Sequence, residues 1–353
     1  MLFQFDSDEL VGEVKDFNEN LALGMQNLLD TDAAYEGVTP YDVVFQQDQL
    51  RLLRYRSDDV VARHSTPLLI VYALVNRPYM TDLQANRSMV RRLLEQGQDV
   101  YLIDWGYPLA TDCCLSLGDY IHAYMATCVQ AVCADYGVDK LNILGICQGG
   151  ALSLCYSALY PDTVHKLITM VTPVDFKTAD NMLSHWVQNV DVDLLVDTLG
   201  NVPGELLNGV FLSLKPYHLL GQKYLSLVDL MKDPQAVKHF MRMEQWIADS
   251  PDQAGEAFRQ FMQDFYQQNK LIKGEVVIDS DRVDLKQLTM PILNVYATQD
   301  HLVPPSASTA LADYVGTDDY TELAFEGGHI GIYVSAKAQK TVPAAIATWL
   351  SER

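Results

Sequence analysis

Residues 140–152 read Lys-Leu-Asn-Ile-Leu-Gly-Ile-Cys-Gln-Gly-Gly-Ala-Leu, an apolar strand pattern that changes into a helix pattern within a few residues. A turn this tight leaves no room for side chains two positions on either side of its tip, which accounts for Gly145 and Gly149, with Gly150 following. Such a nucleophile elbow lifts the residue at its tip, here Cys147, clear of the sheet. At the start of a helix, backbone N–H groups and the helix dipole favour a thiolate. An ordinary glycine turn with a buried cysteine is the alternative that this stretch alone leaves open.

Two later residues offer the acid and the base that a nucleophilic cysteine needs. The apolar strand at 291–296 leads into a loop that holds Asp300, and the strand at 320–325 runs into a glycine-rich loop that holds His329. Nucleophile, acid and base follow one another in the chain order that the nucleophile elbow requires. Because the carboxyl ends of parallel strands meet at one edge of a sheet, all three side chains are predicted to lie together. The sequence therefore predicts a catalytic triad of Cys147, Asp300 and His329.

The rival candidates for these roles have weaker contexts. His301 adjoins Asp300, and a side chain next in sequence rarely points back at its neighbour. Asp104 also ends a predicted strand, but it precedes the nucleophile in the chain, which is the wrong order for the acid of a triad. A structural role, or a contact with a segment that covers the site, is favoured for Asp104. Four arginines in this part of the chain are equally consistent with phosphate binding and with a solvated helix face: Arg77, Arg87, Arg91 and Arg92.

The oxyanion that forms when a nucleophile attacks a carbonyl needs two backbone N–H donors. We expect one from Gln148, directly after the nucleophile, and the other from Val75 or Asn76 in the loop after the first long strand. The sequence contains no Walker A motif, no dinucleotide-binding glycine pattern and no paired metal-ligand motif. Neither a metal nor a cofactor is therefore expected.

The order of elements predicts an α/β protein. Apolar runs typical of buried strands alternate with helix patterns, as in a mostly parallel central sheet flanked by helices. This core is predicted over residues 37–172 and 289–353. Residues 173–288 are helix-rich and aromatic, and are predicted to form a cap over the carboxyl edge of the sheet. Residues 1–36 are predicted to be an N-terminal helical segment, with an amphipathic helix over 7–30.

Composition excludes several function classes. Lys and Arg number 25 against 46 Asp and Glu, and the formal net charge of −21 repels phosphates, so no nucleic-acid partner is expected. The longest apolar run, residues 68–75, is far shorter than the roughly 20 residues of a transmembrane helix. The N-terminus is acidic and lacks the basic and apolar regions of a signal peptide. The six cysteines all lie within 113–155, without zinc-site spacing, so a reduced, cytoplasmic protein is predicted.

The quoted motifs resemble those of the catalytic subunit of polyhydroxyalkanoate synthases, which have the α/β-hydrolase fold. The resemblance rests on the elbow at 145–150, on Asp300-His-Leu-Val-Pro and on Gly327-Gly-His329, and it extends to Asp104-Trp-Gly and Leu74-Val-Asn-Arg. It spans residues 37 to 350, and the length resembles that of the class III type, in which a second, non-catalytic subunit is the partner. The class IV type is similar in size and uses a different partner.

The resemblance implies that the chain polymerises (R)-3-hydroxyacyl-CoA, with 3-hydroxybutyryl-CoA as the expected monomer, into a polyester and releases CoA. The implied partners are the growing polyester chain, a second copy in a homodimer and the non-catalytic subunit, and the implied place is the surface of polyester granules. A cysteine nucleophile fits this chemistry, because it keeps the acyl group as a reactive thioester. A thioesterase, esterase or polyester depolymerase with the same triad is the alternative, and a non-catalytic granule-surface protein is a more distant one.

Overall fold

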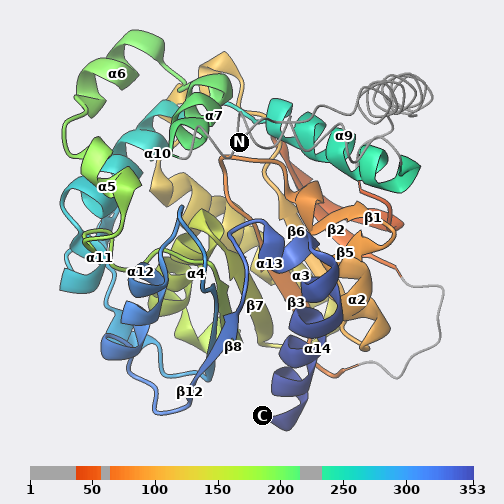
Figure 1. The fold of residues 1–353 in the computed structure, drawn as a ribbon. Coiled ribbons are helices and arrows are strands. Elements are labelled where there is room, and N and C mark those ends of the chain that lie inside the picture. The colour runs from red at the N-terminus through yellow and green to blue at the C-terminus, as the bar shows by residue number, and fades with distance from the viewer. Residues whose placement is uncertain (1–36, 57–63, 215–232) are drawn as a thin grey trace, which may run out of the picture.

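A computed structural model describes residues 37–56, 64–214 and 233–353 of the chain. The predicted N-terminal segment 1–36, with its helix over 7–30, lies outside these described residues. The centre of the fold is an eight-stranded sheet (Figure 1). In spatial order its strands are β1 (Tyr41–Gln47), β2 (Leu50–Tyr55), β6 (Val100–Asp104), β3 (Leu68–Val71), β7 (Leu141–Ile146), β8 (Val164–Met170), β11 (Ile292–Ala297) and β12 (Tyr320–Phe325).

The sheet is parallel from β6 to β12, and β1 and β2 form an antiparallel hairpin at its other edge. The mostly parallel core with flanking helices confirms the prediction from the sequence. The alternating pattern of residues 41–56 also predicts an antiparallel strand pair, and the structure confirms it. Strand β7, which leads to the elbow, pairs with β3 on one side and β8 on the other. The elbow therefore rises from the interior of the sheet, where neighbouring strands fix its position.

Side chains of the central strands alternate between two apolar cores, one on each face of the sheet. In β3, Leu69 and Val71 enter the core on one face, whereas Leu68 and Ile70 enter the other. The first core packs against α3 (Ala126–Tyr136) and α4 (Gln148–Leu159), and the second against α2 (Met89–Glu95) and α14 (Ala336–Glu352). Burial on both faces explains why these strands are continuous apolar runs in the sequence.

The sequence pattern predicts helices over residues 86–96 and 117–136, and both begin differently in the structure. A helix was expected over 86–96, but Arg87–Ser88 pairs as the short strand β5 with β4 (Asp82–Gln84), so α2 begins only at Met89, with Ser88 as its N-cap. The helix expected over 117–136 opens with a π-helical stretch, Asp119–Met125, before α3.

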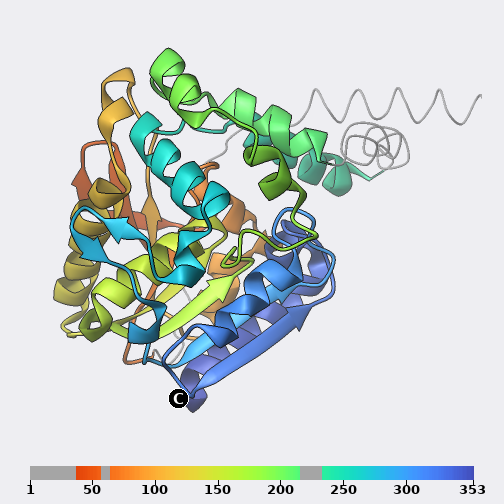
Figure 2. The same cartoon turned by 90° about the vertical axis from the view of Figure 1, so that its left-hand side faces the viewer.

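The chain between β8 and β11 is mostly helical, and its helices gather at one end of the molecule (Figures 1 and 2). It contains α5 (Met182–Val187), α6 (Val192–Leu199), α7 (Gly204–Ser213), α9 (Pro234–Ala248), α10 (Gly255–Gln260), a π-helix (Phe261–Gln267), α11 (Lys270–Lys273) and the two-stranded β9 (Val277–Ile278) and β10 (Asp281–Arg282). The remaining short elements are α12 (Pro305–Thr309), α13 (Gly331–Val334) and several 3₁₀ turns. None of the helices in the described ranges is long and apolar enough to cross a membrane.

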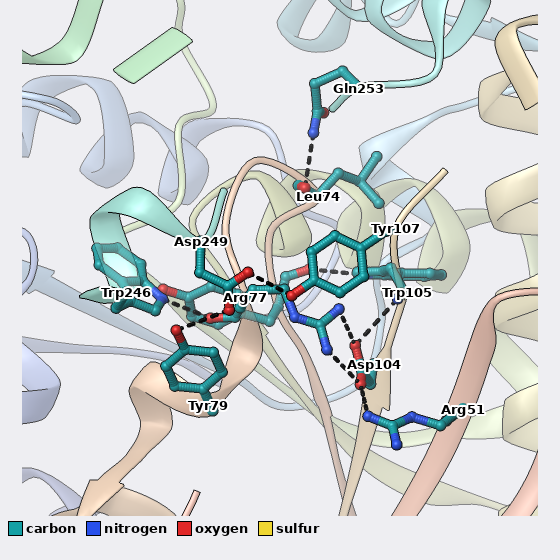
Figure 3. A network of polar contacts seen from close by, with 12 residues as sticks. Arg51, Leu74, Arg77, Tyr79, Asp104, Trp105, Tyr107, Trp246, Asp249 and Gln253 are labelled. Atoms are coloured by element: carbon teal, nitrogen blue, oxygen red, sulfur yellow. Dashed lines mark hydrogen bonds and ion pairs between the residues drawn. The ribbon is translucent and has the colours of Figure 1, made fainter. Parts of the chain in front are cut away.

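A buried ion pair fastens the loop after β3 to the neighbouring strands (Figure 3). The Asp104 carboxylate, at the end of β6, receives two hydrogen bonds from the Arg77 guanidinium, with N···O distances of 2.8 and 3.0 Å. Arg51 of β2 adds a third at 2.7 Å. Both Asp104 and Arg77 are buried, and the Tyr107 ring stacks on the guanidinium at 4.3 Å. This pairing agrees with the structural role that the sequence favoured for Asp104.

We expect Asp104→Ala to destabilise the fold strongly, because it leaves the buried Arg77 charge without its partner. Loss of one member of a buried pair costs about 3–5 kcal/mol, whereas an exposed pair contributes about 0–1 kcal/mol. Glu95→Ala is the matched control, since Glu95 pairs with two arginines, Arg91 and Arg92, on an exposed face of α2. Urea denaturation of both variants measures the difference, and equal losses would contradict the assigned role of the buried pair.

Candidate active site

Cys147 occupies the sharp turn between β7 and α4. Its backbone has φ 54° and ψ −124°, a conformation that L-residues rarely adopt and that an elbow imposes on its tip residue. The Cys147 N–H donates to the carbonyl oxygen of Met170 on β8 at 2.9 Å, which fixes the turn to the sheet. The side chain is partly buried and lies against the same apolar core as Val75.

The glycines around Cys147 are required by close approaches. A Cβ on Gly149 would collide with the carbonyl oxygens of Val71 and Tyr72, so α4 touches the backbone of β3 and its following loop. A Cβ on Gly145 would come within 2.6 Å of both the Gly150 Cα and the Ser153 Oγ. The sequence predicted mutual crowding across the turn. The structure shows that Gly149 is required by the neighbouring strand instead.

Asp300 and His329 meet at this edge of the sheet. The Asp300 Oδ2 lies 2.6 Å from the His329 Nδ1, and both residues are buried, at 6% and 5% exposure. The other carboxylate oxygen, Oδ1, accepts hydrogen bonds from the N–H groups of Leu302 at 2.8 Å and Val303 at 2.9 Å. These backbone donors come from the turn that follows Asp300, so the carboxylate is oriented locally before it contacts the imidazole.

The imidazole of His329 also hydrogen-bonds the Cys147 side chain. Burial lowers the pKa of His329, but the negative charges of Asp300 and Cys147 and the hydrogen bonds to them outweigh it and raise this pKa from its ordinary 6.5 to about 10. The protonated imidazole is therefore held between a carboxylate and a sulfur. A positive charge beside a cysteine favours the thiolate, which is the nucleophilic form.

Three buried tyrosines lie close enough to Cys147 for its charge to act on them, and no motif in the sequence marks them as site residues. They are Tyr72 after β3, Tyr333 in α13 and Tyr266 in the π-helix of the long insertion. Burial raises the pKa of each, and the charge of Cys147 raises it further. The hydroxyls of Tyr72 and Tyr333 lie 3.2 Å apart. Two of these tyrosines, Tyr72 and Tyr333, belong to the apolar core against which Cys147 packs.

The loop after β3 lies beside the first turn of α4, where the sequence placed the oxyanion donors. Gln148 is the first residue of α4, and its side-chain Oε1 accepts the Leu74 N–H at 3.1 Å. Val75 follows Leu74 and shares the apolar core with Cys147. Asn76 donates from its side chain to the Ser250 Oγ at 2.7 Å. The geometry brings Gln148 and Val75 to the neighbourhood of Cys147 and turns the Asn76 side chain towards the insertion.

The remaining polar candidates have structural partners. His329, not His301, hydrogen-bonds Asp300. Arg87 donates to the carbonyl oxygen of Val334 at 3.2 Å, while the two helix-face arginines of α2 pair with Glu95. Within the described ranges, no group of three or more His, Cys, Asp or Glu side chains is arranged to hold a metal ion.

Two family models match the chain. The α/β-hydrolase fold model matches residues 66–336, and the model of the poly-beta-hydroxybutyrate polymerase (PhaC) N-terminus matches residues 11–93. Among solved structures, the Mycobacterium tuberculosis protein Rv0554 aligns with a TM-score of 0.50 at 13% identity, covering 82% of this chain and 91% of that one. A likeness at this identity supports the fold alone.

Three sequence relatives extend over nearly the whole chain. The poly(3-hydroxyalkanoate) polymerase subunits PhaC of Allochromatium vinosum and of Thiocystis violacea are each 60% identical to it, and the alignments cover 98% of this chain and 98% of each relative. The Synechocystis polymerase subunit of the same name is 52% identical over 99% of this chain and 95% of its own length. The chain therefore belongs to the poly(3-hydroxyalkanoate) polymerase PhaC family of α/β-hydrolase-fold enzymes, and it is a polymerase of the acyltransferase type.

Proposed function

We propose that polymerisation proceeds through an acyl-cysteine intermediate on Cys147, with His329 as the proton carrier and Asp300 as its orienting partner. The observation that carries this proposal is the 2.6 Å contact between His329 Nδ1 and Asp300 Oδ2, made beside a cysteine at the tip of an elbow. This contact fixes the imidazole so that its other nitrogen is available to the sulfur. The residues fill the nucleophile, base and orienting roles of a triad.

In the first half-reaction, the Cys147 thiolate attacks the carbonyl carbon of the acyl-CoA thioester. The oxyanion of the tetrahedral intermediate accepts hydrogen bonds from the backbone N–H groups of Gln148 and Val75. The carbon–sulfur bond to CoA then breaks, and the CoA sulfur takes the proton held by His329. One thioester is exchanged for another, so the acyl group stays activated.

In the second half-reaction, His329 removes the proton from a hydroxyl group of the growing chain or of an incoming monomer. The hydroxyl oxygen attacks the acyl-cysteine, and the Cys147 thiolate leaves. An oxoester replaces a thioester, which makes this step downhill and drives elongation. Asp300 stabilises the imidazolium that forms.

Elongation requires that water does not reach the acyl-cysteine. Three buried tyrosines within reach of the Cys147 charge support this requirement: Tyr72, Tyr266 and Tyr333. Tyr266 belongs to the segment 173–288, so we propose that this segment acts as a cap that excludes water. A hydrolase with the same triad would need an open path for water to the same carbon.

The proposed substrate is an (R)-3-hydroxyacyl-CoA, with 3-hydroxybutyryl-CoA as the monomer. We also propose a homodimer, a second non-catalytic synthase subunit as partner and a place at the surface of polyester granules. The relatives' names support the second subunit, since each of the three is called a polymerase subunit. The apolar side chains exposed on α5, α6 and α7 support a contact surface there: Met182, Trp186, Leu194, Leu199 and Leu206.

We expect Cys147→Ala to abolish both CoA release from 3-hydroxybutyryl-CoA and the formation of polyester, because no acyl-cysteine can form. Cys114→Ala is the control, since Cys114 is exposed and outside the triad. The assay measures free thiol, and mass spectrometry identifies the acyl product. Polyester from wild type and Cys114→Ala alone supports the proposal. Stoichiometric 3-hydroxybutyrate from wild type would replace it with a hydrolase, and an active Cys147→Ala would discard the mechanism.

We expect Asp300→Asn to reduce kcat by roughly 10⁴-fold, as loss of the orienting carboxylate does in triads of this kind. It also removes a negative charge that raises the pKa of His329, so this pKa should fall towards 6.5, as measured by an NMR titration of the imidazole. Because the folded-state pKa is raised, protonated His329 stabilises the wild-type fold fully below pH 6.5, and this contribution is lost as the pH rises towards 10.

The matched control is Asp281→Asn, which alters an exposed carboxylate 3.8 Å from His122 on the surface. It should leave both kcat and the His329 titration unchanged. A His329 pKa that stays near 10 in Asp300→Asn would show that Asp300 does not hold the imidazole in its protonated form.

A further inference from the structure

The backbone of Leu74 is held by hydrogen bonds at both its N–H and its C=O, and Figure 3 shows the one at the C=O. The Leu74 N–H donates to the side chain of Gln148, the residue after the nucleophile, at 3.1 Å. The Leu74 carbonyl oxygen accepts from the Nε2 of Gln253 at 2.8 Å. The two bonds come from different parts of the fold: Gln148 begins α4, whereas Gln253 lies in the long insertion.

The hydrogen bond to the Leu74 carbonyl also sets the direction of the next N–H group. A peptide unit is planar, and in a trans unit the C=O and the following N–H point in opposite directions. No cis peptide bond occurs in the described ranges, so the Val75 N–H points away from Gln253. Among the residues that the structure describes, this N–H has no hydrogen-bond acceptor. It is a fixed donor that the described residues leave unused.

Gln253 is itself rigidly placed. It is 3% exposed, and its backbone exchanges two hydrogen bonds with Val202, at 2.8 and 2.9 Å. The same segment of the insertion contacts the loop three more times, and Figure 3 shows the contacts of Trp246 and Asp249. The Trp246 Nε1 donates to the Arg77 carbonyl oxygen at 2.7 Å. The Asp249 carboxylate accepts from the Tyr79 hydroxyl at 3.0 Å, and the Ser250 Oγ accepts from the Asn76 side chain at 2.7 Å. The loop is thus held along its length by residues 246–253.

We propose that Gln253 is a positioning residue for the reaction: by holding the Leu74 carbonyl, it aims the Val75 N–H at the oxyanion of the acyl-cysteine intermediate. The inference rests on the mechanism proposed above, in which that N–H is an oxyanion donor. Seating of residues 246–253 against the loop then completes the site as well as covering it. A chain whose insertion is displaced has its nucleophile but lacks one of its two correctly aimed donors.

The test separates oxyanion stabilisation from general integrity of the site. Gln253→Leu removes the side-chain donor and keeps an apolar group of similar size. Gln267→Leu is the matched control, because the Gln267 side chain makes the same kind of bond, to the carbonyls of Val187 and Val190, within the insertion. Both variants are made in the full chain and compared in thermal unfolding, in acylation by 3-hydroxybutyryl-CoA and in alkylation of Cys147 by iodoacetamide, followed by peptide mass spectrometry.

We expect Gln253→Leu to lower the rate of acylation by about 100-fold, the loss that a misplacement of about 1 Å can cause in a site of this kind. KM should stay within about twofold of wild type, because the donor acts on a charge that develops only in the transition state. Alkylation by iodoacetamide forms no oxyanion, so its rate at Cys147 should be unchanged. Gln267→Leu should match wild type in both reactions even if its unfolding temperature falls equally.

Either of two results would overturn the inference. One is an acylation rate in Gln253→Leu equal to that of Gln267→Leu, and the other is a parallel loss of acylation and alkylation, which would indicate a disrupted site. The failure of the proposed mechanism has a separate signature, since it would leave Cys147→Ala active. An inactive Cys147→Ala with an unaffected Gln253→Leu would therefore reject the positioning role alone.

Discussion

The contact between the first turn of α4 and the backbone after β3 is the constraint on which the site depends. Gly149 permits this contact, since any side chain there would meet the carbonyl oxygens of Val71 and Tyr72. Once α4 lies this close, its first residue, Gln148, reaches the Leu74 N–H and fixes the loop that follows β3. The unusual backbone of Cys147 is the result of joining a central strand to a helix held at that distance.

Asp300 and His329 are brought to Cys147 by loops that follow the strands at the far end of the sheet. Strand β11 pairs in parallel with β8, and β12 pairs in parallel with β11, so the loops after them open at the same edge as the elbow. Asp300 is oriented by two N–H groups of its own turn, and it then holds His329 at 2.6 Å. The imidazole thus sits between two negative groups in a buried place, which accounts for its raised pKa despite the burial that opposes protonation.

The sequence predicted those features that depend on local chain geometry. The elbow glycines, the strands and the two post-strand loops with Asp300 and His329 are readable because each is encoded within a few neighbouring residues. Tyr266 and Gln253 were not predicted, although both lie at or beside the site. They belong to an insertion without a βα rhythm, and only the way it packs on the sheet brings them there. The late start of α2 was missed for a similar reason, because Arg87–Ser88 pairs with β4.

The long insertion therefore contributes to the chemistry in more than one way under the proposed mechanism. Tyr266 excludes water from the sulfur, and Gln253 and its neighbours hold the loop that carries an oxyanion donor. Both sets of contacts come from the long insertion. Displacing the insertion would therefore admit water and misdirect the oxyanion donor at the same time. This linkage protects a polymerase from hydrolysis. When the insertion is displaced, water reaches the acyl-cysteine, but the N–H group that would stabilise the oxyanion of the hydrolytic step is misdirected at the same time. The arrangement favours transfer to a hydroxyl in the closed site over leakage to water in an open one.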